Sequence, residues 1–151
     1  HLVLMHNQER AGYPGGVFES VVSWLRAAAD AAMALGVKRE RLIVDPGIGF
    51  GKTPADSIGL LHRLGELKAA LGGLPLLVGT SRKRFIGEIL GGAPPAERVE
   101  GTAASVALAV AAGADIVRVH DVAYMARVVR VSDAIVRPSP AVGAVDAEGT
   151  S

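Results

Sequence analysis

An acidic residue, a basic cluster and an Arg-x-His pair follow or end short apolar segments of this sequence. Asp45 comes directly after residues 42–44, and Arg118 and His120 stand near the end of the segment that begins at Asp115. A carboxylate beside buried residues needs hydrogen-bond donors, and a ligand with adjacent N–H groups would supply two of them. Arginine and histidine on one strand face suit a diphosphate. These residue types predict a site for a ligand that carries N–H donors and an anionic group.

A glycine-rich loop, residues 46–51, follows Asp45. Glycine lets the backbone approach a flat ligand closely, and Phe50 offers a ring that could stack on it. The loop ends in Gly-Lys-Thr, as a nucleotide-phosphate loop does. That motif requires glycine where this chain has Pro46, and proline lacks the N–H that a phosphate cradle uses. We therefore exclude a triphosphate site, and a helix N-cap or an ion-pair partner is the alternative role for Asp45.

The basic cluster Arg82-Lys83-Arg84 follows Ser81 at a predicted helix N-terminus, which favours anions. A basic tripeptide by itself is most often solvated surface. This one follows a buried strand that ends at the same rim as Asp45, so we predict that it binds a ligand.

Arg118 is one residue inside its predicted strand end, where an unpaired charge is costly unless it faces the mouth of a site. His120 points the same way by the two-residue alternation of a strand. An isolated histidine is more often structural, but the pair predicts an anion site.

Short apolar segments alternate with longer helical ones, which is typical of repeated βα units. Strands are predicted at residues 1–5, 42–44, 74–78 and 115–119. Helices are predicted at 17–35, from 54 to about 71, from a cap at Thr80-Ser81 through 90, from about 96 to 112, and at 122–135. The second of these helices carries its apolar face at Ile58, Leu61, Leu64, Leu67 and Leu71.

The strand ends recur roughly every 34 to 41 residues, so the α/β chain contains about four βα units. Each strand is apolar at successive positions, as in a sheet covered on both faces. Four parallel strands could form a small doubly wound domain, or one half of a closed (β/α)8 TIM barrel. In both, ligands bind beyond the carboxyl ends of the strands. Because the sequence begins at His1 inside an apolar segment, we expect a fragment whose upstream residues are missing.

Composition excludes several classes of function. The 16 Lys and Arg against 15 Asp and Glu give a net charge of +1, so the overall electrostatic potential does not favour binding to nucleic acid or to a membrane surface. The apolar runs are too short to span a membrane. The absence of cysteine excludes disulfides and thiolate metal sites and is compatible with the cytoplasm, the expected location. Residues 138–151 predict a disordered tail after a folded domain at 1–137.

Five segments together resemble the dihydropteroate synthase family, whose members have a pterin-binding (β/α)8 barrel. They are LMHNQ at 4–8, DPGIGFGKT at 45–53, LLVGTSRKRFIG at 76–87, RVEGTAAS at 98–105 and IVRVHDV at 116–122. The segments occur in the family's order over residues 2–137, and the second and third together are the specific part. The resemblance implies that residues 1–137 are a partial pterin-binding domain, the C-terminal half of such a barrel.

The resemblance implies a transferase of folate biosynthesis. It would join 6-hydroxymethyl-7,8-dihydropterin diphosphate to 4-aminobenzoate, giving 7,8-dihydropteroate and diphosphate. Asp45 would hydrogen-bond the amino-pyrimidine edge of the pterin, and Lys83 would contact the pterin ring. The other residues expected to line the pterin pocket are Met5, Phe50 and Gly79.

The same resemblance places Arg118 against the pterin face, with its guanidinium reaching the diphosphate, and His120 on the diphosphate oxygens. Lys83, Arg118 and His120 are therefore the expected catalytic residues. The residues expected at the aminobenzoate are Ser81, Arg82 and Arg84, the last through its backbone N–H.

The family's first four strands supply the Mg²⁺-binding asparagine, further pterin-binding residues and two mobile loops, and this sequence contains none of them. We therefore expect a Mg²⁺ cofactor whose ligand lies in the missing half, with no metal ligand in this chain. The chain alone is expected to be inactive, and the intact protein is expected to be a homodimer.

Two other functions compete with the synthase. A methyltetrahydrofolate-binding methyltransferase would share the barrel and the aspartate but has no use for Ser81-Arg82-Lys83 at an aminobenzoate. A non-catalytic α/β module that binds an anion stays open until the upstream sequence is known.

Overall fold

The computed structural model describes residues 1–8 and 12–138 of the 151-residue chain. The predicted disordered tail at 138–151 lies outside the described residues, apart from Pro138. In the described ranges, no helix combines the length and the apolarity needed to cross a membrane.

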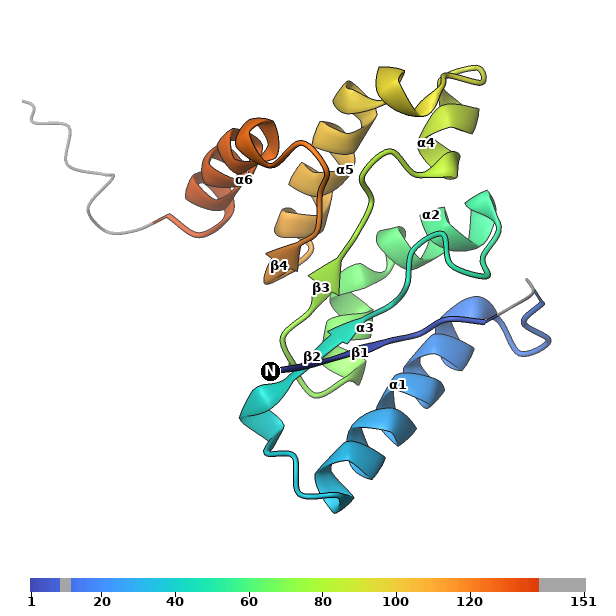
Figure 1. The fold of residues 1–151 in the computed structure, drawn as a ribbon, viewed down its shortest axis with the longest axis vertical. Coiled ribbons are helices and arrows are strands. Elements are labelled where there is room, and N and C mark those ends of the chain that lie inside the picture. The colour runs from blue at the N-terminus through green and yellow to red at the C-terminus, as the bar shows by residue number, and fades with distance from the viewer. Residues whose placement is uncertain (9–11, 139–151) are drawn as a thin grey trace, which may run out of the picture.

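Four short strands run parallel, in the order in which they occur along the chain (Figure 1). They are β1 (Leu2–Met5), β2 (Leu42–Asp45), β3 (Leu77–Val78) and β4 (Ile116–Val117). β1 pairs with β2 and β3 pairs with β4, and a bridge between Val44 and Leu76 joins the two pairs. A doubly wound sheet reverses its strand order at a switch point, and these four strands have no such reversal. Their order is that of consecutive units of a barrel.

Helices follow each strand, as predicted (Figure 1). They are α1 (Val17–Ala34), α2 (Pro54–His62), α3 (Leu64–Ala70), α4 (Arg84–Ile89), α5 (Val99–Ala111) and α6 (Val122–Val136). Short 3₁₀ turns at Arg39–Arg41 and Pro95–Glu97 precede β2 and α5. Thr53 and Asp56 form a reciprocal capping box at the start of α2, and Pro54 is its first residue.

The single helix predicted from residue 54 to about 71 is wrong, because the chain breaks at Arg63 into α2 and α3. The backbone of Arg63 leaves helical geometry with φ −102° and ψ 23°. Its guanidinium lies 3.6 Å from the centroid of the Phe18 ring. The break also changes the buried face, since Leu60 is fully buried whereas Ile58 is 43% exposed.

The predicted helix cap at Thr80-Ser81 is also wrong. α4 begins at Arg84 after Lys83, with no side-chain cap hydrogen bond. The hydroxyl of Thr80 instead accepts a hydrogen bond from Ser105 of α5 at 2.9 Å, and Ser81 contacts His120. Both hydroxyls are buried, so they bond to side chains from later elements rather than to the helix that follows them.

Helices cover one face of the strands in the described part of the chain. Leu42, Val44, Leu76 and Val78 are at most 1% exposed and join residues of α1, α2 and α3 in one core. Residues on the alternate positions are more open, and Val3 and Ile116 keep 45% and 38% exposure. The expectation that both faces are covered is therefore wrong for this chain by itself.

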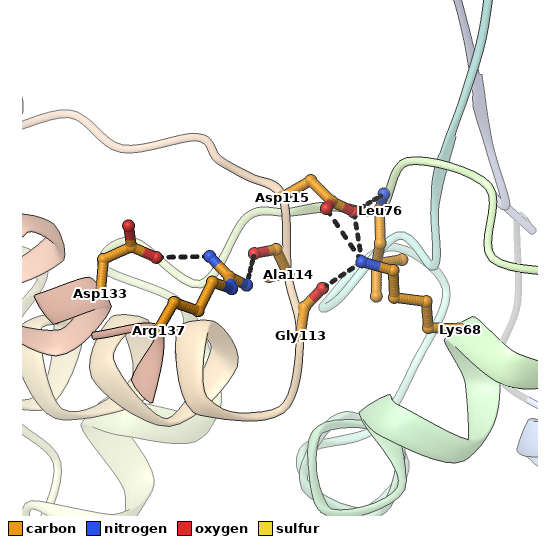
Figure 2. A network of polar contacts seen from close by, with 7 residues as sticks. All are labelled: Lys68, Leu76, Gly113, Ala114, Asp115, Asp133 and Arg137. Carbon is orange, nitrogen blue, oxygen red and sulfur yellow. Dashed lines mark hydrogen bonds and ion pairs between the residues drawn. The ribbon is translucent and has the colours of Figure 1, made fainter. Parts of the chain in front are cut away.

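A polar cluster ties β3, β4 and α3 together at the amino ends of the strands (Figure 2). Nζ of Lys68 donates to the carbonyl of Gly113 at 2.7 Å and lies 2.8 and 2.9 Å from the two carboxylate oxygens of Asp115. The same carboxylate accepts the backbone N–H of Leu76 at 2.8 Å. Arg137 contacts Asp133 and donates to the carbonyl of Ala114. This end of the sheet is opposite to the rim predicted for the site.

Replacing Asp115 by asparagine should lower the free energy of unfolding by about 1 kcal/mol at neutral pH, a modest cost because the pair is partly exposed. Burial raises the pKa of Asp115, but the hydrogen bonds from Lys68 and Leu76 offset this and hold it below its ordinary value. The ionised carboxylate therefore stabilises the fold above the unfolded-state pKa of about 3.9, and this contribution is lost as the pH falls through the lower folded-state value. Urea unfolding of both proteins from pH 7 to pH 3 checks this, and a difference that stays constant with pH contradicts it.

Candidate active site

Asp45 is the last residue of β2, and its side chain is almost completely buried. Oδ1 accepts the backbone N–H of Gly47 at 2.7 Å, and Oδ2 lies 3.5 Å from Nη2 of Arg118. Burial raises the pKa of this carboxyl group, although the Gly47 N–H and nearby cations oppose the shift. The next helix begins only at Pro54, so the helix N-cap alternative is wrong, and an ion pair with Arg118 is present. A carboxylate accepts about four hydrogen bonds, so capacity for a ligand is left.

A cavity of about 340 Å³ opens at the carboxyl ends of β3 and β4, next to Asp45. Its lining consists of Phe50, Gly79, Ser81, Lys83, Arg118, Val119 and His120. All but Val119 were predicted for the site from the sequence. Met5 and Asp45 adjoin the cavity through Arg118, whose Nη2 lies 3.9 Å from the sulfur of Met5. The fold therefore brings residues from all four βα units to one place.

The ring of Phe50 faces two cations. Nζ of Lys83 lies 3.8 Å from the ring centroid, and Cζ of Arg118 lies 6.0 Å from it, both within reach of cation–π attraction. Burial lowers the pKa of Lys83, and Arg118 lowers it further, while Asp45 opposes them. A Cβ added at Gly79 would lie 3.3 Å from Nη2 of Arg118, so glycine leaves room for the arginine. One aromatic face and two positive charges thus border the same space.

Ser81 orients His120 in the cavity wall. The hydroxyl of Ser81 accepts the backbone N–H of His120 at 3.2 Å and lies 2.8 Å from Nδ1 of its ring. The hydroxyl hydrogen is free to go to Nδ1, and with that bond the neutral imidazole carries its proton on Nε2. That arrangement leaves an N–H donor on the ring, which suits an anionic group.

The side chains of Arg82 and Arg84 do not line the cavity. The family resemblance implies both residues at the aminobenzoate, Arg84 through its backbone N–H. Arg82 forms a bidentate ion pair with Asp121, at 2.7 and 3.2 Å. Arg84 is 82% exposed and pairs with Glu88 of its own helix. Arg82 has a positive φ of 57°, and this bend lies between the two cavity residues Ser81 and Lys83.

Three residues that sequence reasoning missed hold this bend. Arg98 donates from Nη1 to the carbonyls of Arg82 and Lys83, at 2.9 and 3.2 Å. The fully buried hydroxyl of Thr102 accepts the backbone N–H of Arg82, and Asp121 pairs with its guanidinium. Their polar side chains lie inside the segments RVEGTAAS and IVRVHDV or at their ends, which is the signal that could have found them.

Across residues 1–8 and 12–138, no group of three His, Cys, Asp or Glu side chains could hold a metal ion. Asp45, the buried carboxylate of the site, is bound to Gly47 and Arg118. These residues do not fit a complete Mg²⁺ site.

Comparison with known proteins gives the chain a family. A sequence profile described as "Pterin binding enzyme" matches residues 1–120. Dihydropteroate synthase of Synechocystis is 50% identical over 123 residues, which are 82% of this chain and 42% of that protein. A relative in Mycobacterium tuberculosis named inactive dihydropteroate synthase 2 is 43% identical over 82% of this chain and 38% of its own length. The chain thus spans less than half the length of these curated relatives.

Solved structures agree with the sequence comparison. Dihydropteroate synthase from Clostridium difficile, crystallised in the presence of pteroic acid, matches with a TM-score of 0.84 and 44% identity over 89% of this chain and 50% of that one. The enzyme from Xanthomonas albilineans with 4-aminobenzoic acid matches with a TM-score of 0.83 and 40% identity, over 91% of this chain and 50% of that one. The chain therefore belongs to the family of pterin-binding enzymes and has their TIM-barrel type of α/β fold.

Proposed function

We propose that the intact protein is a dihydropteroate synthase and that this chain supplies the C-terminal half of its barrel. The reaction joins 6-hydroxymethyl-7,8-dihydropterin diphosphate to 4-aminobenzoate, with release of diphosphate. The observation that carries the proposal is the buried carboxylate of Asp45 beside a cavity that Phe50, Lys83 and Arg118 line. That combination offers acceptors for N–H groups, an aromatic face and positive charge within one site.

Asp45 binds the pterin in this proposal. The amino-pyrimidine edge of a pterin presents adjacent N–H donors, and an ionised carboxylate accepts two such bonds side by side. Lys83 contacts the ring, and Phe50, Gly79 and Met5 form the surrounding wall. The closeness of Lys83 to Phe50 and of Arg118 to Met5 supports this assignment.

Arg118 and His120 stabilise the departing diphosphate. Breaking the carbon–oxygen bond places negative charge on the leaving group and positive charge on the pterin methylene carbon. The amine of 4-aminobenzoate then forms the new carbon–nitrogen bond, and the proton that it loses goes to the released diphosphate or to water. Fixed donors aimed at developing charge are usually the largest electrostatic contribution to catalysis. The guanidinium of Arg118 and the Nε2–H of His120 are such donors, and both groups line the cavity.

The segment that includes Ser81, Arg82 and Arg84 receives the aminobenzoate. Ser81 lines the cavity, which supports a direct role for it. The side chains of Arg82 and Arg84 are engaged by Asp121 and Glu88, so Arg84 contributes through its backbone N–H, and Arg82 contributes through the bend that it forms between Ser81 and Lys83. Residues for aminobenzoate favour the synthase over a methyltetrahydrofolate-binding methyltransferase, which has no use for them.

The rest of the protein is expected to complete both the barrel and the site. Val3 at one edge of the sheet, Ile116 at the other, and Val131 and Ile135 of α6 leave apolar surface that four more βα units would cover. Mg²⁺ is proposed to bind residues outside this chain, and none of the roles above depends on it. The chain alone is expected to lack activity.

We propose a homodimer in the cytoplasm. An apolar groove of about 880 Å³ lies among α2, α4 and α5. Ile58, Ile89 and Leu108, all exposed, are among the residues that line it. Its apolar surface supports contact with a second copy of the protein.

A coupled assay of diphosphate release by the complete protein tests the proposed function. Release should require both the pterin diphosphate and 4-aminobenzoate, and mass spectrometry should identify dihydropteroate. Calorimetric binding of the pterin diphosphate without turnover would instead indicate a binding protein. Absence of both would overturn the assignment.

A further inference from the structure

The loops that follow β1 and β2 touch through their backbones. A Cβ at Gly47 would lie 1.9 Å from the carbonyl oxygen of His6, and a Cβ at Gly51 would lie equally close to that of Gln8. Both glycines have positive φ, at 66° and 58°. The backbone N–H of His6 also donates to the carbonyl of Asp45 at 3.0 Å. The glycine-rich loop that carries Phe50 therefore rests directly on the end of β1.

Lys52 connects these two loops. Its Nζ lies 2.9 Å from Nδ1 of His6 and donates to the carbonyls of Phe50 at 3.1 Å and of His6 at 3.4 Å. An ammonium group has three N–H donors and no acceptor, so these contacts use all of them. The lysine of the Gly-Lys-Thr sequence is thus directed at protein atoms and not at a phosphate.

His6 is a buried partner with a defined protonation state. Its side chain is 3% exposed and packs edge-on against Trp24, at 5.5 Å between ring centroids, and against Tyr13. Because Lys52 can only donate, Nδ1 must accept, and the neutral ring carries its proton on Nε2. Burial and then the charge of Lys52 lower the pKa of His6 to about 4. The ring is therefore neutral at physiological pH.

We propose that Lys52 is a positioning residue that clamps the loop after β2 to the loop after β1 and so holds the Phe50 ring at the pterin cavity. The inference rests on the proposed function, because the ring matters only if a pterin binds there. Lys52 touches the backbone of Phe50, and the ring of Phe50 faces Lys83 and Arg118. Without the contacts of Lys52 the loop can shift, and the Phe50 ring that borders the ligand cavity shifts with it.

Several charges bear on the clamp. The pKa of Lys52 is lowered to about 8, mainly by burial and also by the charge of Lys83, while Asp45 and Asp56 oppose the shift. Arg118 lies beyond Asp45, and Tyr13 lies beside His6. Below about pH 8 Lys52 has three N–H donors, and above that pH it loses one. Affinity for the pterin should therefore weaken as the pH rises through about 8.

The chain offers a matched control for Lys52. Lys68 also donates to a carbonyl and to a side chain of another element, but at the opposite end of the strands (Figure 2). Replacing either lysine by methionine removes a clamp of similar kind. A purely structural role for Lys52 predicts that the two variants behave alike.

In the complete protein, Lys52→Met should raise the KM and the calorimetric Kd for the pterin diphosphate by about 10- to 100-fold, the size of effect that a misplaced binding group produces. Lys68→Met should lower stability without changing either constant. If Lys52→Met and Lys68→Met are both active and have the same KM and Kd, the clamp proposal is wrong and the proposed function stands. An inactive wild-type protein that binds no pterin would overturn both. Should Lys52→Met fail to fold, Lys52→Gln, which keeps two N–H donors, should give the same change at smaller size.

Nitrogen NMR of the His6 ring tests the clamp without any activity. In the wild-type protein, the ring should be the neutral Nε2–H tautomer at pH 7 and titrate near pH 4. Loss of the Lys52 charge should raise that pKa toward the ordinary value of about 6.5 in Lys52→Met, and leave it unchanged in Lys68→Met. A protonated ring or the Nδ1–H tautomer at pH 7 in the wild type would disprove the contact.

Discussion

Replacing Asp45 by asparagine in the complete protein should weaken binding of the pterin diphosphate by roughly 10²- to 10⁴-fold. Each hydrogen bond to a charged group is worth about 1.5 to 3 kcal/mol, and two are lost, at about 1.4 kcal/mol for each tenfold in affinity. The amide can still accept the N–H of Gly47, but its NH₂ group would face the N–H donors of the ligand. Isothermal titration calorimetry measures the loss, and unchanged affinity would rule out the pterin role of Asp45.

The Asp45→Asn protein should remain folded. Burial raises the pKa of Asp45, so the charged carboxylate is costly to keep inside the fold, and its neutral isostere should unfold at the same or a higher temperature. For the same reason, pterin affinity in the wild type should fall with acid at a pH above the ordinary aspartate value of about 3.9. Loss of binding together with a lower Tm would point to damage to the fold. Calorimetry across pH 4 to 8 measures the fall in pterin affinity at low pH, the acid limb of binding.

Replacing Arg118 by methionine should lower kcat by about 10²- to 10³-fold, the usual effect of removing one preorganised donor from a developing anion. The guanidinium lies in the cavity wall between Asp45, Met5 and Phe50, and methionine keeps part of its apolar contact. Steady-state kinetics with both substrates measures the change. A rise in KM with unchanged kcat would show that Arg118 only binds the substrate.

Arg118 has a second effect, through Asp45. Its charge opposes the rise in the pKa of Asp45, so its removal should shift the acid limb of pterin binding to higher pH. Arg137→Met is the matched control, because that arginine also bonds beside β4 but at the other end of the strands (Figure 2). The control should change stability and leave kcat and the acid limb where they are.

The relative named inactive dihydropteroate synthase 2 shows why activity has to be measured with variants of the site. Membership in the family is compatible with loss of activity, since a protein 43% identical to this chain carries that name. The site here contains the aspartate, lysine, arginine and histidine that the proposed chemistry uses. Family membership therefore does not establish activity, and the measurements on the Asp45 and Arg118 variants test it.

The family, the order of the βα units and most of the cavity lining could be predicted from the sequence. Carboxyl ends of parallel strands meet at one edge of a sheet, so Asp45, Gly79, Arg118 and His120 could be placed together from their positions after apolar segments. The motif containing Phe50 lies at the same edge. Each of these positions can be recognised from its immediate neighbours in the sequence, without knowledge of the tertiary contacts.

The directions of the side chains between these positions depend on contacts that form only in the folded protein. Arg82 is drawn to Asp121, 39 residues away, and Ser81 bonds to His120, equally distant along the chain. Lys52 bonds to His6 across 46 residues. Such pairings depend on which polar group meets a buried partner once the strands are side by side. Because an unpaired buried donor is costly, the fold selects these partners, and no local pattern in the sequence reports them.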